Sequence, residues 1–470
     1  MLSLLALTLF GLYTPANWAV FPSLDEVRCI SSTGSEVFVA VPAGVCVLSR
    51  PRYELIRTVN EADGIRGEVR LCAHNPSRGD VYITTDEHLY RFVPATGRVN
   101  ELTAPFKSVS SIGIADSGAF FETNAGLFFR GRVAAEFAPV TDVPNDLTWY
   151  GARDTLQPRD FPFLTPYFVM DEQLINHPLT LVRPDKGNRR LFVVAQDYGI
   201  LVYSIMSGFS EAHIRFGPSR AAVQRIVPLD DRLWFIGGST VVGLDSAGGW
   251  HYFITRPGDL ATGNFRLLFG NVTNLERSEG LRALLPDSSG LLFGTDYGIY
   301  QLGRDNKLLQ LVNLPHRVNG LLQVHDSLLF GTDQGLFYAK GDSVVEYSDP
   351  YGATDWGVFN IVRSTNGTAW FGALGGVVSR TPDGRWFHYV PPGFDLKQPI
   401  SALAAAGTRV FMATGKDITV LDTKDNSWAT IDSSRGLPDS QVTSLYADDR
   451  FLWLATPGLI YRLDYTQELR

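Results

Sequence analysis

Two segments of the chain share nearly the same twelve residues, LLFGTDYGIYQL at 291–302 and LLFGTDQGLFYA at 328–339. Each copy contains an apolar run, a Gly-Thr-Asp-x-Gly turn and a second apolar run, which is the pattern of a β-hairpin. Because the copies lie 37 positions apart, they indicate a structural repeat. A repeat restricts the chain to folds in which similar units pack side by side and bury their faces against one another.

The pattern occurs ten times, and most copies are spaced by about 40 residues. Each copy predicts a first strand, a polar turn, a second strand, a Gly-containing turn, a third strand and, in most copies, a fourth strand with Trp or Tyr. This period and strand content are typical of a four-stranded propeller blade. We expect the ten second strands to begin near Val37, Val81, Ala119, Leu191, Leu233, Leu291, Leu328, Ala369, Val410 and Phe451.

The two ends of the chain complement one another. The last unit stops after its third strand, and the N-terminal segment NWAVFPS at 17–23 is similar to the fourth strand NSWATIDSS at 426–434. We therefore expect Trp18 and its neighbours to pair with the segment around Leu459–Leu463, which removes two exposed sheet edges. This predicts an all-β propeller of about ten blades over 17–470, closed as a single ring. The alternatives are two rings, or a seven-bladed ring with extra blades.

Composition agrees with an all-β chain and argues against some functions. The 470 residues include 45 Gly and 26 Pro, which favour turns over helices. The net charge is −8 and no Lys/Arg tract is present, so electrostatic attraction does not favour nucleic acid or anionic membranes as partners. Three cysteines, Cys29, Cys46 and Cys72, fit buried free thiols better than a disulfide framework, although one disulfide within the first two repeats is possible.

The first sixteen residues, MLSLLALTLFGLYTPA, form an apolar stretch that is too short to span a bilayer. They are similar to the apolar core of a secretory signal, with Thr14-Pro15-Ala16 as a small-residue cleavage site, although no basic residue precedes Arg28. The alternative is a buried apolar strand. We expect a signal peptide at 1–16 and a periplasmic or secreted protein.

The segment DSSRGLPDSQVTSLYADDRFLWLATPGLIYRLD at 432–464 resembles the two-component-regulator propeller repeat of bacteria. It has a Gly-Leu-Pro start, a Val-x-x-Leu strand, an Asp-rich turn, a Trp-containing strand and a Tyr-x-x-Asp end. The segment at 61–92 is a weaker copy. The resemblance implies a propeller that works outside the cytoplasm, either as part of a sensor or as a stand-alone secreted protein. For this chain it implies a recognition module.

Two long insertions, at about 131–178 and 247–280, interrupt the repeats, and we expect both to emerge on the face that carries the Gly-Thr-Asp-x-Gly turns. Loops on one face of a rigid scaffold often carry binding residues. The first insertion is rich in aromatic residues, and Trp149, Tyr150 and Tyr167 could stack on a sugar ring or on a partner protein. The alternative is a lid that packs these rings on itself.

A second candidate site comes from the first strands, in which one polar residue lies between two apolar core positions. In a propeller the first strand lines the central channel, so these polar side chains should face it. Arg28 and Arg70, on adjacent blades, could hold a carboxylate or a sulfate. The alternative is a wet channel that only needs polar walls. The position is occupied by Arg28, Arg70, Ser110, Thr180, Gln224, Arg282, Asn319, Asn360, Ser401 and Thr443.

Signatures of propeller enzymes are missing from the sequence. The polar position contains no Asp or Glu, no GxSxG or HExxH motif is present, and the eight His residues form no pair with metal-ligand spacing. We expect no cofactor and no metal. The sequence predicts a monomeric scaffold that binds a saccharide, a cell-surface polymer or a partner protein. The alternative is a propeller lyase or hydrolase with an atypical channel site.

Overall fold

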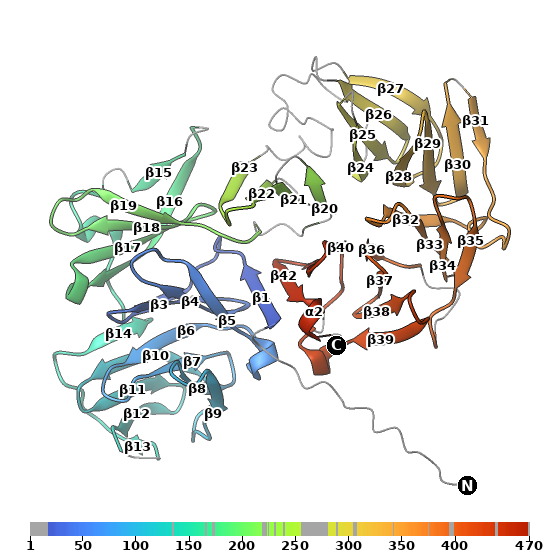
Figure 1. Cartoon of the computed structure of the whole chain (residues 1–470). Coiled ribbons are helices and arrows are strands. Elements are labelled where there is room, and N and C mark those ends of the chain that lie inside the picture. The colour runs from blue at the N-terminus through green and yellow to red at the C-terminus, as the bar shows by residue number, and fades with distance from the viewer. Residues whose placement is uncertain are drawn as a thin grey trace, which may run out of the picture. The chain divides into compact units, whose positions relative to one another are not determined.

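The fold was analysed in a computed structural model of the chain. The structure describes residues 17–468 apart from 134–135, 165–166, 172–173, 219–222, 224, 230–231, 238–239, 255–280, 288–289, 304–307, 342, 375, 394–398 and 438–439. The predicted signal peptide at 1–16 and most of the second insertion therefore lie outside the described residues. The described part is almost entirely β-structure, arranged as ten antiparallel sheets (Figure 1). This confirms the all-β propeller class.

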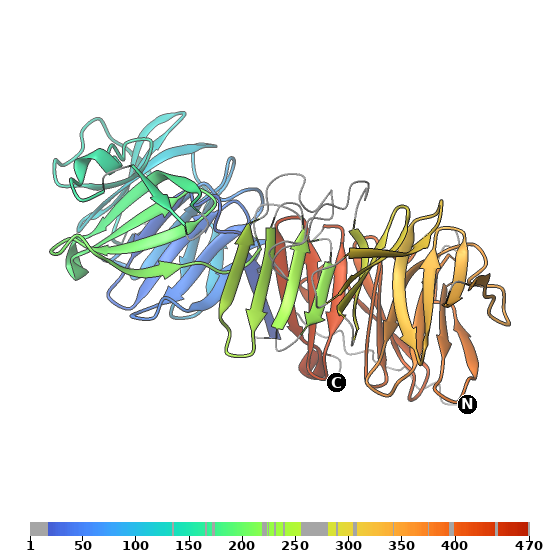
Figure 2. The same cartoon turned by 90° about the horizontal axis from the view of Figure 1, so that it is seen from above.

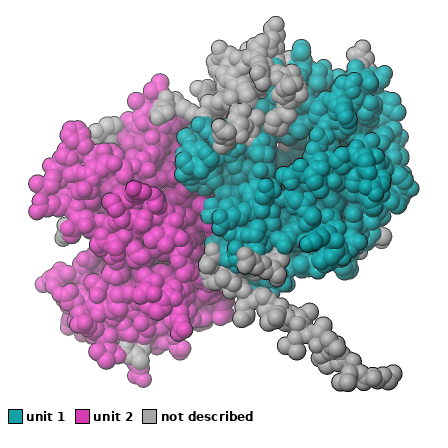
Figure 3. All heavy atoms as spheres, viewed as in Figure 1, with its two compact units in different colours: residues 1–18, 221–470 teal, residues 19–220 magenta. Residues whose placement is uncertain are grey.

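The sheets belong to two compact units, which are coloured separately in Figure 3. Unit 1 contains residues 1–18 and 221–470, and unit 2 contains residues 19–220. The boundary falls within the first strand of the chain. Each unit is described below by itself.

Six sheets have their inner strand in unit 1. Five of them follow the chain: β20 (Arg225–Leu229), β21 (Arg232–Gly237), β22 (Thr240–Asp245) and β23 (Trp250–Ile254); β24 (Leu281–Asp287), β25 (Gly290–Thr295), β26 (Gly298–Gly303) and β27 (Leu308–Asn313); β28 (Val318–Val324), β29 (Ser327–Thr332), β30 (Gly335–Lys340) and β31 (Ser343–Glu346); β32 (Val358–Arg363), β33 (Ala369–Ala373), β34 (Gly376–Arg380) and β35 (Trp386–Tyr389); β36 (Ala402–Ala406), β37 (Arg409–Thr414), β38 (Asp417–Asp422) and β39 (Ser427–Ile431).

The sixth sheet joins the two ends of the chain, in the order β1 (Trp18–Pro22), β42 (Leu459–Asp464), β41 (Phe451–Thr456) and β40 (Ser444–Ala447). A short helix, α2 (Tyr465–Glu468), follows it. The expected pairing of the N-terminal strand with the last unit is therefore confirmed. The Trp18 ring packs edge-on against Tyr461, with centroids 6.2 Å apart, and its indole N–H donates to the carbonyl of Arg435 at 2.9 Å.

Unit 2 contains four sheets. They are β2 (Cys29–Ser32), β3 (Glu36–Val41), β4 (Gly44–Ser49) and β5 (Leu55–Val59); β6 (Leu71–Asn75), β7 (Asp80–Thr84), β8 (Leu89–Val93) and β9 (Arg98–Glu101); β10 (Val109–Ala115), β11 (Gly118–Thr123), β12 (Gly126–Gly131), β13 (Ala138–Pro139) and β14 (Thr148–Gly151); β15 (Phe168–Met170), β16 (Asn176–Asp185), β17 (Arg190–Ala195), β18 (Gly199–Ser204) and β19 (Ser210–Ile214). Short 3-10 turns are η2 (Glu61–Asp63), η3 (Pro158–Asp160) and η4 (Lys186–Asn188), with η5 (Ser433–Arg435) in unit 1.

The repeated Gly-Thr-Asp-x-Gly turn has a structural explanation in the hairpin of β29 and β30. The Thr332 hydroxyl donates to the carbonyl of Gly335 at 3.1 Å and accepts from the backbone N–H of Gln334 at 3.0 Å. Gly335 has φ +140°, a conformation that side chains rarely adopt. The first glycine of the motif, Gly331, has a different role, because a Cβ there would lie 2.5 Å from Val358 of the next sheet. That glycine lets neighbouring sheets approach closely.

The prediction of one ring with all ten sheets is wrong, and the alternative of two rings is nearer to the structure, in which unit 1 closes a ring of its own. In unit 1 the inner strands β20, β24, β28, β32, β36 and β40 pack in succession, and β20 also packs against β40. The Thr443 hydroxyl, just before β40, donates to the carbonyl of Val223, just before β20, at 2.6 Å. The ring therefore closes after six sheets. Its strands run along the ring axis, as Figure 2 shows from above.

The error in ring size has a topological cause. Because β1 completes the last sheet of unit 1, pairing of the chain ends does not require all ten sheets to lie in one ring. Residues 19–220 form their own compact unit between β1 and β20 in the sequence. In that unit β2, β6 and β10 pack in succession and β16 packs against β2.

Candidate functional site

A cavity of about 270 Å³ lies among the inner strands of unit 1. All six inner strands contribute to its lining, and each of them is an edge strand of its sheet. An inner strand at the end of its sheet has one edge without a neighbouring strand, so it directs backbone N–H and C=O groups out of the sheet. Most side chains of the lining are aliphatic, including Leu321, Ile361 and Leu403. The cavity therefore combines apolar side chains with backbone hydrogen-bonding groups.

Two of the predicted ligand-binding residues, Asn319 and Asn360, line this cavity near the first residues of β28 and β32. Their amides also join neighbouring sheets. Asn319 Nδ2 donates to the carbonyl of Val358 at 3.4 Å, and Asn360 Nδ2 donates to the carbonyl of Ile400 at 2.8 Å. Each amide keeps its Oδ1 acceptor for another partner.

Three arginines form a chain of contacts that begins at this cavity. Arg225 lines it, and its Nε donates to the carbonyl of Arg282. The predicted site residue Arg282 pairs with Asp296 at 2.8 Å, and Arg317 lies 3.5 Å from the same carboxylate. Burial and the nearby positive charge of Arg282 lower the pKa of Arg225 to about 10. Asp296 thus serves as a shared partner for two of these three guanidinium groups.

The other end of the cavity is lined by Arg363 and Tyr446. The Arg363 guanidinium donates to the carbonyl of Gln323 at 2.6 Å, which joins the ends of β32 and β28. Burial raises the pKa of the Tyr446 hydroxyl, so the group stays protonated at neutral pH. This end offers a hydroxyl and a guanidinium.

Arg28 and Arg70, the predicted anion site, lie close together in unit 2. Both contact Glu68: Arg28 Nη2 at 2.8 Å and Arg70 Nη2 at 3.8 Å from Oε2. Arg28 also pairs with Glu26, and Arg70 pairs with Asp86 at 2.7 Å. Three carboxylates thus already surround two guanidinium groups, and an acidic ligand would have to displace them. The binding role of Arg28 and Arg70 stays a prediction.

The remaining polar positions of the predicted ring are separated. The Thr180 hydroxyl lies 3.5 Å from the carbonyl of Val194, within its own sheet in unit 2. Gln224 lies outside the described residues. The structure therefore places Asn319 and Asn360 in the lining of the unit 1 cavity and Arg282 in contact with the lining residue Arg225, whereas Arg28, Arg70 and Thr180 lie in the other unit.

The aromatic insertion forms strands instead of an open loop. β14 pairs with the inner edge of β10, and β15 pairs with the inner edge of β16. Tyr150 is only 8% exposed, its hydroxyl bonds with Ser31 Oγ at 3.1 Å, and the Arg183 guanidinium lies 3.7 Å from its ring centroid. Its ring therefore packs in the core of unit 2 and is not available to stack on a ligand, which corrects the prediction for Tyr150.

The two other aromatic candidates differ. Trp149 is half-buried, with the Arg153 guanidinium 4.7 Å from its ring centroid. Tyr167 is 52% exposed beside β15. The packing alternative therefore describes Tyr150, while Tyr167 remains accessible.

One signal in the sequence could have revealed the role of the polar position. The ten positions are occupied by only five residue types, Arg, Ser, Thr, Gln and Asn. All five can donate hydrogen bonds, and none is a carboxylate. A position that must contact a backbone carbonyl of the next sheet requires a donor. The contacts of Arg28 with the carbonyl of Val69 at 2.9 Å and of Thr443 with that of Val223 have this form.

Within the described part of the chain, no three His, Cys, Asp or Glu side chains come together in a way that could hold a metal ion. None of the described helices is long and apolar enough to cross a lipid bilayer.

No family model and no curated protein matches the sequence. The chain is similar to the extracellular domain of a hybrid two-component system protein from B. thetaiotaomicron, with 13% identity and a TM-score of 0.39 over 93% of this chain and 70% of that one. It is also similar to a catalytically inactive variant of virginiamycin B lyase from Staphylococcus aureus, solved with quinupristin: 14% identity, TM-score 0.37, 63% of this chain and 98% of that one. A third similar structure is PorZ, a surface component of the type-IX secretion system of Porphyromonas gingivalis. The identity is 12% and the TM-score 0.34, over 94% of this chain and 79% of that one.

Proposed function

We propose that this chain is an extracytoplasmic recognition module and that the cavity of unit 1 binds a single acidic sugar residue, free or at the end of a chain. The observation that carries the proposal is the lining of the cavity, to which all six inner strands contribute. Asn319, Asn360 and Arg225 stand at one end of it. The apolar N-terminal segment supports a location outside the cytoplasm.

The size and chemistry of the cavity support a small polar ligand. Its volume of about 270 Å³ is near the lower end of the range for ligand pockets. That space suits one ring-sized group better than a long chain. Amides, backbone groups and the Tyr446 hydroxyl can bind hydroxyl groups, while Leu321 and Ile361 can contact the CH groups of a sugar ring.

The charge at the amide-lined end supports an acidic ligand over a neutral one. Arg225 and Arg282 are close enough for the charge of one to lower the pKa of the other. A ligand carboxylate placed there would relieve this repulsion and could accept charge-assisted hydrogen bonds. Because Arg225 is partly buried, such bonds should be stronger than at a fully exposed site.

The test is a titration of oligosaccharides that end in a hexuronate, with neutral oligosaccharides of the same length as comparison. Calorimetry should detect binding of the acidic series. Arg225→Gln should weaken it about tenfold or more, because hydrogen bonds to charged groups contribute roughly 1.5–3 kcal/mol. Arg52→Gln, which changes an exposed arginine in unit 2, is the matched control. Equal affinity of the wild-type and Arg225→Gln proteins for hexuronate would contradict the proposal.

A partner protein is a second candidate, favoured by the hairpin of β15 and β16. Met170 and Leu174 are 57% and 74% exposed, and Tyr167 and Phe168 are also exposed. Leu174 has φ 63°, which is costly for a branched apolar side chain in solvent. A binding function for this hairpin would be tested with Met170→Asp and Leu174→Asp. These changes should abolish capture of a protein partner and leave hexuronate binding unchanged.

A further inference from the structure

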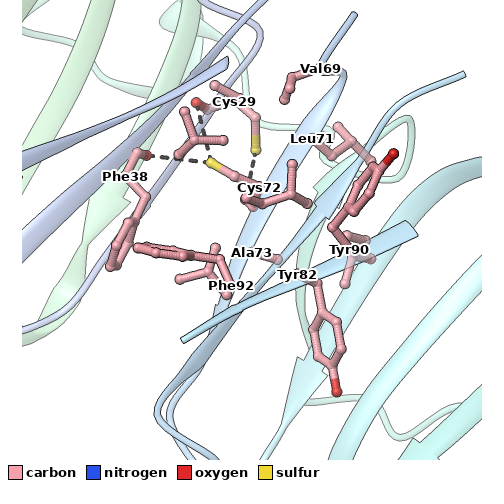
Figure 4. Close-up of a cluster of buried hydrophobic side chains, with 14 of the residues drawn as sticks. Cys29, Phe38, Val69, Leu71, Cys72, Ala73, Tyr82, Tyr90 and Phe92 are labelled. Carbon is pink, nitrogen blue, oxygen red and sulfur yellow. Dashed lines mark hydrogen bonds between the residues drawn. The ribbon is translucent and has the colours of Figure 1, made fainter. Parts of the chain in front are cut away.

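Cys29 and Cys72 lie against one another between two neighbouring sheets of unit 2. Cys29 begins β2 and Cys72 is the second residue of β6. The Cys29 thiol donates to the carbonyl of Cys72 at 3.1 Å, and the Cys72 sulfur lies 3.8 Å from the carbonyl of Cys29 and 3.5 Å from that of Phe38. Figure 4 shows the two sulfur atoms side by side in this cluster. Each side chain therefore reaches the backbone of the other residue.

Both thiols are buried in an apolar cluster that includes Phe38, Tyr82 and Phe92. Their chemical environments differ. The neighbouring Cys72 thiol lowers the pKa of Cys29 through a hydrogen bond, and burial raises the pKa of Cys72 well above its usual value. The third cysteine, Cys46, is buried in β4, where burial raises its pKa to about 12. Of the three, Cys29 is therefore the one best suited to become a thiolate.

We propose that Cys29 and Cys72 are the site of an intramolecular disulfide that joins the first two sheets of unit 2 under oxidising conditions. The crossing of the two side chains carries the proposal. To close the bond, the two sulfurs leave their carbonyl partners and turn toward each other. Disulfides need closely spaced backbones, and β2 packs against β6 at the point where each sulfur contacts the backbone of the other cysteine.

The chemistry balances with a low-molecular-weight aliphatic disulfide as the oxidant. The Cys29 thiolate attacks one sulfur of the oxidant, forms a mixed disulfide and releases one thiolate. Cys72 then loses its proton and attacks the Cys29 sulfur, which releases the second thiolate. The two protein thiols lose two electrons and two protons, and the oxidant gains them as two small thiols.

Burial sets the order of events. Because Cys72 has no exposed surface and Cys29 is 4% exposed, the oxidant reaches them before the two sheets have packed or when the sheets open. The bond should form during folding and then stay protected. It would close a loop that contains β2–β5 and reduce the number of conformations open to the unfolded chain. The bond should therefore stabilise unit 2.

The direct test is to refold the full chain in a mixture of reduced and oxidised glutathione. Remaining thiols are then alkylated and the peptides mapped by mass spectrometry. The expected result is one linked pair, Cys29 with Cys72, and an alkylated Cys46. Cys46→Ser should keep the linkage, and Cys29→Ser and Cys72→Ser should lose it. Full alkylation of Cys29 and Cys72 in the folded wild-type protein, or linkage to Cys46, would overturn the proposal.

A stability measurement tests whether the disulfide, once formed, stabilises the folded protein. The oxidised wild-type protein should unfold roughly 5–15 °C above the reduced protein, because a disulfide typically contributes several kcal/mol. Reductant should remove this difference. In the Cys29→Ser/Cys72→Ser double variant the midpoint should not respond to reductant. An oxidised midpoint at or below the reduced one would show that the bond strains the sheets and would overturn the stabilising role.

Discussion

The Thr443 hydroxyl donates a hydrogen bond to the backbone carbonyl of Val223, 2.6 Å away and 220 residues earlier in the chain. The contact closes unit 1, because these residues stand just before β40 and β20. Asn360 makes the same kind of contact with Ile400, which is only 40 residues away. The ring thus uses the same type of bond between two of its successive sheets and where its last sheet meets its first.

Removing this closing bond should destabilise unit 1. Thr443→Val keeps the shape of the side chain but leaves the Val223 carbonyl without this donor. We expect a loss of about 1–2 kcal/mol in the free energy of unfolding. Urea unfolding followed by tryptophan fluorescence measures it, with Thr430→Val on the exposed outer strand β39 as control. Equal losses in the two variants would show that the bond has no special role.

Neighbouring sheets should be sensitive to a single methyl group at Gly331. A Cβ there would lie 2.5 Å from Val358 Cγ1, so Gly331→Ala forces the two sheets apart. Overpacking of this kind costs about 1–3 kcal/mol of stability. Gly34→Ala is the control, since nothing lies within 4 Å of its Cβ position.

The second substitution Val358→Ala makes the test specific. If steric contact is the cause, the Gly331→Ala/Val358→Ala protein should lose less stability than the sum of the single variants. If the stability losses of the two single variants add up to that of the double variant, the methyl group does not act through contact with Val358.

The N-terminal strand should matter for the last sheet. Trp18 is 9% exposed, packs on Tyr461 and donates to the carbonyl of Arg435. Trp18→Ala should cost about 3–4 kcal/mol, and Trp18→Phe, which keeps most of the ring, should cost about 1 kcal/mol. Trp356, which is 75% exposed, provides the control Trp356→Ala. Similar unfolding midpoints for Trp18→Ala and the control would contradict the pairing of β1 with β42.

Unit 2 should lose stability in mild acid. Burial lowers the pKa of His74, a half-buried side chain of β6, below its usual 6.5. As the pH falls below 6.5, the unfolded chain takes up protons that the folded unit does not, so the free energy of unfolding decreases. Urea unfolding at several pH values should show this slope, and His74→Gln should reduce it. A stability that rises on acidification would contradict this environment of His74.

Much of the fold was predictable from local pattern. The Gly-Thr-Asp-x-Gly hairpins, the core position of Cys72 and the pairing of Trp18 with the last unit all follow from short segments whose partners are similar in every repeat. Ring size was not. A donor at or near the start of an inner strand can bond to the carbonyl of the next strand whichever sheet supplies it, as Thr443 does with Val223. Nothing in the local sequence shows whether the ring closes after six sheets or after ten.

The candidate site was predicted only in part, for a related reason. Asn319 and Asn360 were identified because polar residues stood out between core positions, and both line the cavity. Tyr150 was misjudged because its burial depends on β14 pairing with β10, a contact between segments that lie far apart in the repeat pattern. Aromatic content alone does not separate a binding surface from a core strand.

Hydrogen exchange with and without a hexuronate-terminated oligosaccharide tests the central claim most directly, because it reports where the ligand acts. The account predicts slower exchange in β28 and β32, which carry Asn319 and Asn360, and unchanged exchange around Arg28 and Arg70 in unit 2. Protection confined to unit 2, or no protection at a ligand concentration that saturates binding, would contradict it.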